Sequence, residues 1–119
     1  MKRTLPILIT VLLALASQAE ADESHHAVTV RLNSFTTTVS QIDAAMASYD
    51  PLLFAWWQEE KAETVPYITG VVLNLSVASQ FPANSPTYTF YVTNASVLLD
   101  VAESIIEPWK NFIEPPMEN

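Results

Sequence analysis

Apolar and polar residues alternate in three short segments of the chain, and this period-two pattern constrains the predicted fold more than any other feature. In the first segment Val28, Val30 and Leu32 alternate with polar residues. Alternation of this kind is typical of a strand that buries one face and exposes the other. The three segments are residues 28–35, 67–79 and 87–93. We therefore expect three β-strands, with a bulge at Gly70, the only glycine of the chain.

The segments outside the predicted strands have apolar residues at helical spacing. In residues 36–49 the apolar positions recur at steps of three, four and three, which describes one face of a helix. Asp50 and Pro51 favour a new helix start, because Asp is a good N-cap and Pro is well placed at a first helical position. We expect this second helix, or a kinked continuation of the first, to run to about Glu63, since Pro66 should stop it.

A final helix is expected after the third strand, capped by Asn94 or Ser96 and kinked or broken at Pro108. The predicted order is β-α(α)-β-β-α. We expect an α+β fold, a two-layer sandwich whose small, mostly antiparallel three-stranded sheet is covered on one face by helices. Its connectivity corresponds to a ferredoxin-like unit without the last strand, a likeness of topology alone. The missing strand would leave one sheet edge open to a partner.

The first 21 residues have the pattern of a signal peptide. Lys2 and Arg3 form a short positive region, an apolar run follows, and Ala19 and Ala21 occupy the small-residue positions before a cleavage site. The apolar run is shorter than the ~20 residues of a membrane span. We expect residues 1–21 to be removed and residues 22–119 to form one domain, with flexible ends at 22–27 and 115–119. The protein is then exported, to the periplasm or outside the cell, without a stable membrane anchor.

Composition excludes several classes of partner and scaffold. The chain has no cysteine, so a disulfide-stapled scaffold is excluded. Its net charge is −8 at pH 7, and removal of the signal peptide would leave only Arg31, Lys61 and Lys110 as lysines or arginines. Such an acidic chain repels nucleic acid and anionic membrane surfaces.

The adjacent histidines His25 and His26 are candidate metal ligands. With Asp22 and Glu23 they could bind Cu²⁺ or Zn²⁺ loosely. Neighbouring side chains on an extended chain point to opposite sides, so one metal ion needs an irregular backbone there. The alternative is a solvated tail without a cofactor.

Aromatic residues supply the candidate binding surface. Phe54, Trp56 and Trp57 lie within four positions, and a helix cannot turn both tryptophans toward the same core point. We expect Leu53 and Trp56 to pack inward, with Trp57 as a further candidate for the core, and Phe54 to lean outward. An exposed aromatic side chain suggests a binding patch, and core packing is the alternative. Tyr88 and Tyr91 of the third predicted strand complete the candidate set. A further alternative is a ligand pocket between sheet and helices, gated by Trp56, Trp57, Tyr88 and Phe90.

The chain shows no pattern of a catalytic centre. It has no nucleophile elbow and no metalloprotease motif, and its single glycine excludes a phosphate-binding loop. The acidic residues Glu59, Glu60 and Glu63 fit a solvated helix face better than acid–base chemistry. We therefore expect a non-enzymatic binding or accessory module that contacts another exported protein, or a second copy through the open sheet edge. The alternative is a periplasmic carrier of a metal or small ligand that uses the histidine pair.

Overall fold

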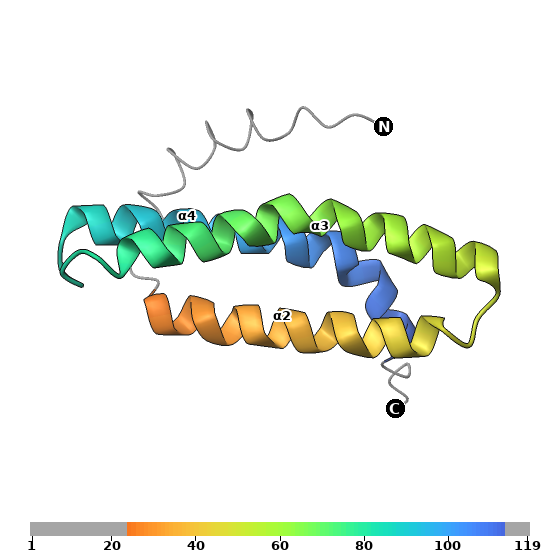
Figure 1. Cartoon of the computed structure of the whole chain (residues 1–119). Helices are drawn as coiled ribbons and strands as arrows, with labels where there is room; N and C mark the ends of the chain where they lie inside the picture. Colours follow the sequence, from red (N-terminus) through yellow and green to blue (C-terminus); the bar gives the residue numbers. More distant parts are fainter. Residues whose placement is uncertain (1–23, 114–119) are drawn as a thin grey trace.

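The computed structural model describes residues 24–113, which fold into helices packed side by side (Figure 1). The elements are α2 (His25–Met46), α3 (Pro51–Ala78), α4 (Pro86–Ile106) and the 3₁₀-helix η1 (Glu107–Phe112). No β-strand occurs among residues 24–113. The predicted α+β sandwich is therefore wrong, and with it the three-stranded sheet and its open edge. The predicted signal peptide, residues 1–21, lies outside the described residues.

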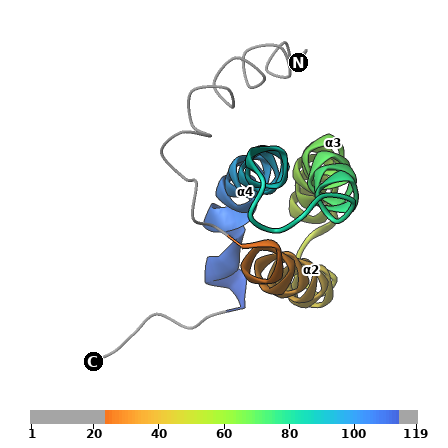
Figure 2. The same ribbon diagram turned by 90° about the vertical axis from the view of Figure 1, so that its left-hand side faces the viewer.

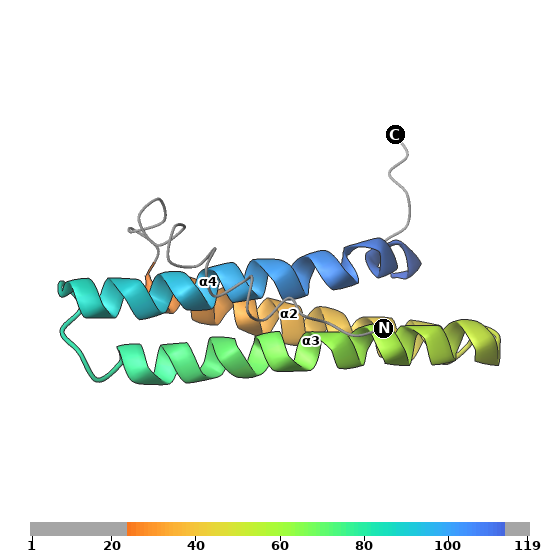
Figure 3. The ribbon, with the colours of Figure 1, turned by 90° about the horizontal axis from the view of Figure 1, so that it is seen from above.

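The three α-helices run up, down and up along one bundle (Figures 1 and 3). α3 and α4 form an antiparallel hairpin and make the most extensive contact in the molecule. Seen end-on, α2 lies beneath this hairpin and completes a triangle (Figure 2). η1 turns away from the end of α4 and packs against α2. None of the helices within residues 24–113 combines the length and apolar character needed to cross a membrane.

The first predicted strand is helical because a longer period overrides the short alternation. Val28, Phe35 and Ile42 are separated by seven residues each and are buried on one face of α2. Leu32 and Val39 fall between them and pack against the same core. Val30, which the alternation placed on the same strand face as Val28, is 48% exposed. A spacing of four and three is the repeat of helices packed as a bundle, so α2 buries its apolar residues only as a helix.

α4 replaces the third predicted strand for the same reason. Its buried apolar positions alternate by steps of three and four and continue into η1: Val92, Ala95, Leu99, Ala102, Ile106 and Trp109. Phe90 belonged to the alternating pattern but lies outside this series and is 41% exposed. The helix begins eight residues before the predicted cap at Asn94, because Ser85 caps it by accepting a hydrogen bond from the Tyr88 N–H.

α3 continues through Pro66, where the second predicted helix was expected to end. A proline removes one N–H, so the carbonyl of Ala62 loses its partner within the helix. Ala62 and Pro66 are both exposed, and water can hydrate that carbonyl. Gly70 is not a bulge in a strand. A Cβ atom there would lie 2.7 Å from Leu98 Cδ1, so the glycine allows α3 to approach α4 closely.

Two predicted helix boundaries are confirmed. Asp50 is the N-cap of α3, accepting a hydrogen bond from the Leu53 N–H, and Pro51 occupies the first helical position. Nearer the C-terminus, α4 ends at Ile106 and Pro108 lies in η1. This end was expected because proline has no N–H to continue an α-helix.

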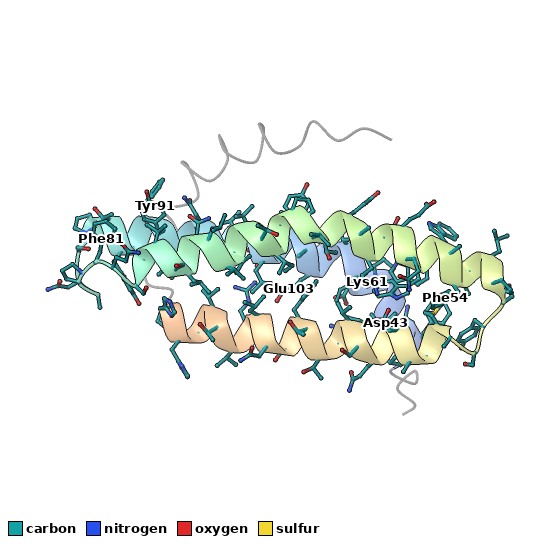
Figure 4. The ribbon with its side chains drawn as sticks, in the orientation of Figure 1. Asp43, Phe54, Lys61, Phe81, Tyr91 and Glu103 are labelled. Atoms are coloured by element: carbon teal, nitrogen blue, oxygen red, sulfur yellow. The ribbon has the colours of Figure 1, made fainter. Side chains whose placement is uncertain are left out.

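Two polar networks connect α2 to the other helices (Figure 4). The Arg31 guanidinium donates hydrogen bonds to Ser96 at 2.9 Å, to Glu103 at 2.9 Å and to Asp100. Asp43 accepts hydrogen bonds from the Trp57 indole at 2.7 Å and from the Lys61 ammonium at 3.0 Å. α2 is thus fastened to α4 near one end and to α3 near the other, which sets its position in the bundle.

Candidate functional site

The sequence-predicted binding residues lie at opposite ends of the bundle. Phe54, Trp56 and Trp57 belong to the start of α3, whereas Tyr88 and Tyr91 lie at the start of α4. Figure 4 shows Phe54 at one end of the molecule and Tyr91 at the other. With a rise of ~1.5 Å per residue, α3 separates the two groups by about 30 Å. The predicted pocket gated by both groups is therefore wrong, because the groups are too far apart and residues 24–113 form no sheet to line it.

Trp57 is a core residue. Its side chain is fully buried, and its indole N–H is hydrogen-bonded to Asp43. Phe54 is half-buried and also packs against the core. Phe54 and Trp57, two of the five candidate binding residues, therefore contribute to the core. Core packing was the alternative interpretation of this aromatic stretch.

Trp56, by contrast, is 58% exposed and lies against Trp109 of η1. The two ring centroids are 5.9 Å apart and the ring planes are nearly perpendicular, a favourable edge-to-face contact. Trp109 in turn contacts Trp57 at 5.3 Å and Phe112 at 5.8 Å. Trp109 is therefore the centre of the aromatic cluster, although it was not among the candidate binding residues of the sequence.

The cluster borders a shallow groove of about 320 Å³, which we call the aromatic groove. Its lining comes from α3 and from η1: Leu53, Trp56, Glu60, Pro108, Trp109 and Phe112. Five of these side chains are apolar or aromatic, and Glu60 is the one carboxylate. Apolar walls with a single charged group suit an apolar anchor that carries a positive charge beside it.

The charge around the groove is negative. Every lysine and arginine in residues 24–113 is already paired with an acid of the same chain: Arg31 with Asp100 and Glu103, Lys61 with Asp43, and Lys110 with Glu107. Burial lowers the pKa of Arg31, but the hydrogen bonds and charges of Glu103 and Asp100 outweigh this effect and raise it above the usual value. Glu59 and Glu60, one turn beyond Trp56, thus leave this end of the surface acidic.

Tyr88 and Tyr91 have structural neighbours at the other end of the bundle. The Tyr88 hydroxyl accepts a hydrogen bond from the backbone N–H of His25, which joins the start of α2 to α4. The Tyr91 ring lies between Phe81, stacked at 6.4 Å, and Phe90, edge-on at 5.2 Å. Phe81 and Phe90 are both partly exposed, at 39% and 41%.

The histidine pair lies in the first turn of α2, in a segment expected to be a flexible end. His25 Nε2 is 3.2 Å from the Leu75 carbonyl, and Nδ1 is 3.4 Å from the Thr29 hydroxyl. His26 is exposed, and neighbouring residues of a helix point about 100° apart. No group of three or more metal-ligating side chains occurs within residues 24–113. Asp22 and Glu23 lie outside the described residues, so metal binding by the pair stays a prediction.

Comparison with protein-family models, with curated proteins and with solved structures finds no match to this chain. No relative therefore supplies a function or a set of site residues. The function has to be inferred from the surface chemistry of the helices, of which the aromatic groove is the most specific part.

Proposed function

We propose that the protein is a small, exported, non-enzymatic binding module that holds a partner protein in the aromatic groove. The observation that carries this proposal is the position of Trp56, which is 58% exposed yet held edge-on against the buried Trp109. A large aromatic side chain fixed at the rim of a groove can contact a partner without first losing its own freedom. Tryptophan is also among the residues that contribute most to binding energy at protein interfaces.

The chemistry of the groove specifies the kind of partner. The apolar lining of Leu53, Trp56 and Phe112 accepts an aliphatic or aromatic side chain. Glu60 within the lining and Glu59 beside it attract a lysine or arginine next to that anchor. A cation placed over the Trp56 ring would gain a cation–π interaction in addition. The expected ligand is therefore a protein segment with an apolar anchor flanked by basic residues.

Export rests on the pattern of residues 1–21, which lies outside the described structure. The charged n-region, the short apolar run and the small residues before position 22 together favour a cleaved leader. Mass spectrometry of the protein from the producing cell tests this point, because cleavage removes the first 21 residues. An intact amino terminus in every cell fraction would contradict export.

A set of model peptides tests the groove directly. The probes are capped pentapeptides with the centres Lys-Leu-Lys, Glu-Leu-Glu and Lys-Ser-Lys, added to the ¹⁵N-labelled protein. We expect the Lys-Leu-Lys peptide to shift the indole N–H signals of Trp56 and Trp109, and the other two peptides to shift them much less. Equal shifts with all three peptides would reject a groove that selects an apolar anchor next to a cation.

Two single variants, one at Trp56 and one at Leu52, test whether the peptide binds in the aromatic groove. Trp56→Ala should weaken binding of the Lys-Leu-Lys peptide by about tenfold or more, as expected for a residue at the centre of an interface. Leu52→Ala is the matched control, because Leu52 is 80% exposed on the same helix but does not line the groove. If both variants bind like the parent protein, the aromatic groove is not the binding site.

A further inference from the structure

The half of the bundle that lies away from the aromatic groove has no charged residue on α3 or α4. Neither an acidic nor a basic side chain, histidine included, occurs from Thr64 to Leu99. This stretch forms the second half of α3, the connecting loop and the first part of α4. The acids of the hairpin lie outside this stretch, at Glu59, Glu60 and Glu63 of α3, at Asp100 and Glu103 of α4 and at Glu107 of η1. Because the antiparallel helices pack Gly70 against Leu98, Asp100 lies beside the middle of α3.

Within the uncharged half, α3 exposes apolar side chains to solvent. Val65 is 57% exposed, Val72 is 50% exposed and Leu73 is 60% exposed. Val65, Thr69, Val72 and Ser76 are exposed at steps of four, three and four, so they form one straight stripe along the outside of the helix. We call this stripe the outer face of α3. It repeats at the spacing of a helix–helix seam, although no described helix covers it.

The outer face continues into a groove between α3 and α2. Val65 and Thr69 line both features, and the groove adds Ile68 from α3 and Phe35 and Val39 from α2. Its volume is about 320 Å³. The one charged residue in its lining is Lys61, which is paired with Asp43 of the same chain. An exposed apolar surface whose one charged residue is already paired within the chain is typical of a site that contacts another protein.

We infer that a second copy of this chain covers the outer face of α3, to form a symmetric dimer. The charge distribution points to this occupant. All lysines and arginines of residues 24–113 are engaged by the chain's own acids, so this part of one copy has no unpaired lysine or arginine to offer to the acids of another. Two acidic copies can therefore meet without opposing like charges only through the uncharged half.

The same argument gives the orientation of the two helices. A parallel pairing of the α3 helices would place the acids at residues 59–63 of both copies side by side. An antiparallel pairing that crosses near Thr69 places them at opposite ends of the interface. A two-fold axis then brings Thr69 of one copy against Thr69 of the other, and Ala62 against Ser76. These small side chains allow the two helices to approach closely.

Cysteine cross-linking tests both the dimer and its geometry, because the chain has no native cysteine. Each variant is purified from the producing cell, so that any cleavage of its amino-terminal segment has already taken place. We expect Thr69→Cys to oxidise to a disulfide-linked dimer. Val30→Cys is the control, since Val30 is 48% exposed on α2 and away from the outer face. Equal cross-linking of the two variants, or none in either, would overturn the proposed interface.

Charge substitutions test the same contact without oxidation. Sedimentation should show that the parent protein dimerises with increasing concentration. Val72→Glu should raise the protein concentration at which half of the chains are dimeric at least tenfold, whereas Val30→Glu should leave this concentration unchanged. Because position 69 faces itself, Thr69→Glu and Thr69→Lys should each be monomeric but should associate when mixed. A parent protein that stays monomeric at millimolar concentration, or a Thr69→Cys protein that cross-links in the cell to a different protein, would overturn the dimer.

The dimer and the aromatic groove are separate proposals with separable tests. Trp56→Ala should leave the dimerisation midpoint unchanged, and Val72→Glu should bind the Lys-Leu-Lys peptide like the parent protein. Circular dichroism melting of each variant establishes that it is folded before either comparison is made.

Discussion

The Trp57 indole N–H on α3 donates a 2.7 Å hydrogen bond to Asp43 on α2, and this bond satisfies the only polar group of a fully buried side chain. The same carboxylate accepts a hydrogen bond from Lys61 one turn further along α3. Asp43 thus connects a core residue and a surface cation of one helix to its neighbour.

The first prediction concerns this carboxylate. Asp43→Ala leaves the Trp57 N–H buried without a partner, which should lower the free energy of unfolding by about 1–3 kcal/mol. Chemical denaturation measures the loss. Glu59→Ala is the control, because Glu59 is an exposed acid whose removal should change stability by less than about 0.5 kcal/mol. A similar loss in both variants would contradict the role of Asp43.

The second prediction separates the two adjacent tryptophans. Trp57 is fully buried, so Trp57→Ala should cost about 3–5 kcal/mol of stability through the lost packing and the cavity left behind. Trp56 is largely exposed, and Trp56→Ala should cost far less. Thermal melting of the two variants distinguishes them. Comparable melting temperatures would mean that the two side chains are not divided between core and surface.

The third prediction concerns the close approach of α3 and α4 at Gly70. Alanine is favoured over glycine in a helix by roughly 1 kcal/mol, but a Cβ atom here would lie 2.7 Å from Leu98 Cδ1. The two effects oppose each other, so Gly70→Ala should change stability little in the parent protein. In a Leu98→Ala background the contact is absent, and Gly70→Ala should stabilise by about 1 kcal/mol. A double-mutant cycle without coupling would contradict the contact.

The fourth prediction concerns Arg31 and the pH dependence of stability. Arg31→Gln removes the ion pairs with Asp100 and Glu103 and should destabilise the protein by about 1–3 kcal/mol. The pKa of Arg31 is raised in the folded protein, so its contribution is fully present below the ordinary arginine pKa and is lost only as pH rises through the raised value.

The difference in unfolding free energy between the parent and Arg31→Gln should therefore stay constant from about pH 6 to about pH 9. Urea denaturation at several pH values measures it. A difference that disappears within this range would show that a group other than Arg31 controls the interaction. Lys110→Gln, which removes an exposed pair with Glu107, is expected to have little effect at any of these pH values.

The fifth prediction tests the histidine pair as a metal site. The His25 ring is engaged by Leu75 and Thr29, and the His26 side chain points about 100° away from it around the helix. We expect the parent protein and the His25→Ala/His26→Ala double variant to bind Cu²⁺ and Zn²⁺ equally weakly in calorimetric titrations. A strong affinity that only the parent shows would support the carrier function instead.

Local features of the sequence predicted two helix boundaries correctly. Asp50 and Pro51 begin a helix and Pro108 lies beyond the end of one, because capping and the missing proline N–H act within a few residues. The strands were predicted wrongly because short windows of β-branched and aromatic residues satisfy two periods at once. Val28, Val30 and Leu32 alternate, yet Val28 also belongs to the seven-residue series with Phe35 and Ile42.

The candidate site was predicted only in part. The aromatic stretch at residues 54–57 was expected to turn Trp56 inward and Phe54 outward, whereas Trp56 is 58% exposed and Phe54 is half-buried against the core. Trp109 and Phe112 were missed, since they lie more than fifty residues further along the chain and meet Trp56 only where η1 folds back. A series of apolar residues at steps of three and four, continued from α4 through Trp109, was the available signal for a longer helical segment.

The sequence by itself determined the acidic charge, the absence of cysteine, the cap of α3 at Asp50 and the uncharged stretch from Thr64 to Leu99, since these depend on residue identity or on near neighbours. Only the tertiary structure decided that the stretch is a helical hairpin, which residues of it stay exposed, and that Trp56 meets Trp109. The physical reason is that burial is shared: a face of α3 becomes core or surface according to whether α2 and α4 cover it, and no local pattern contains that information.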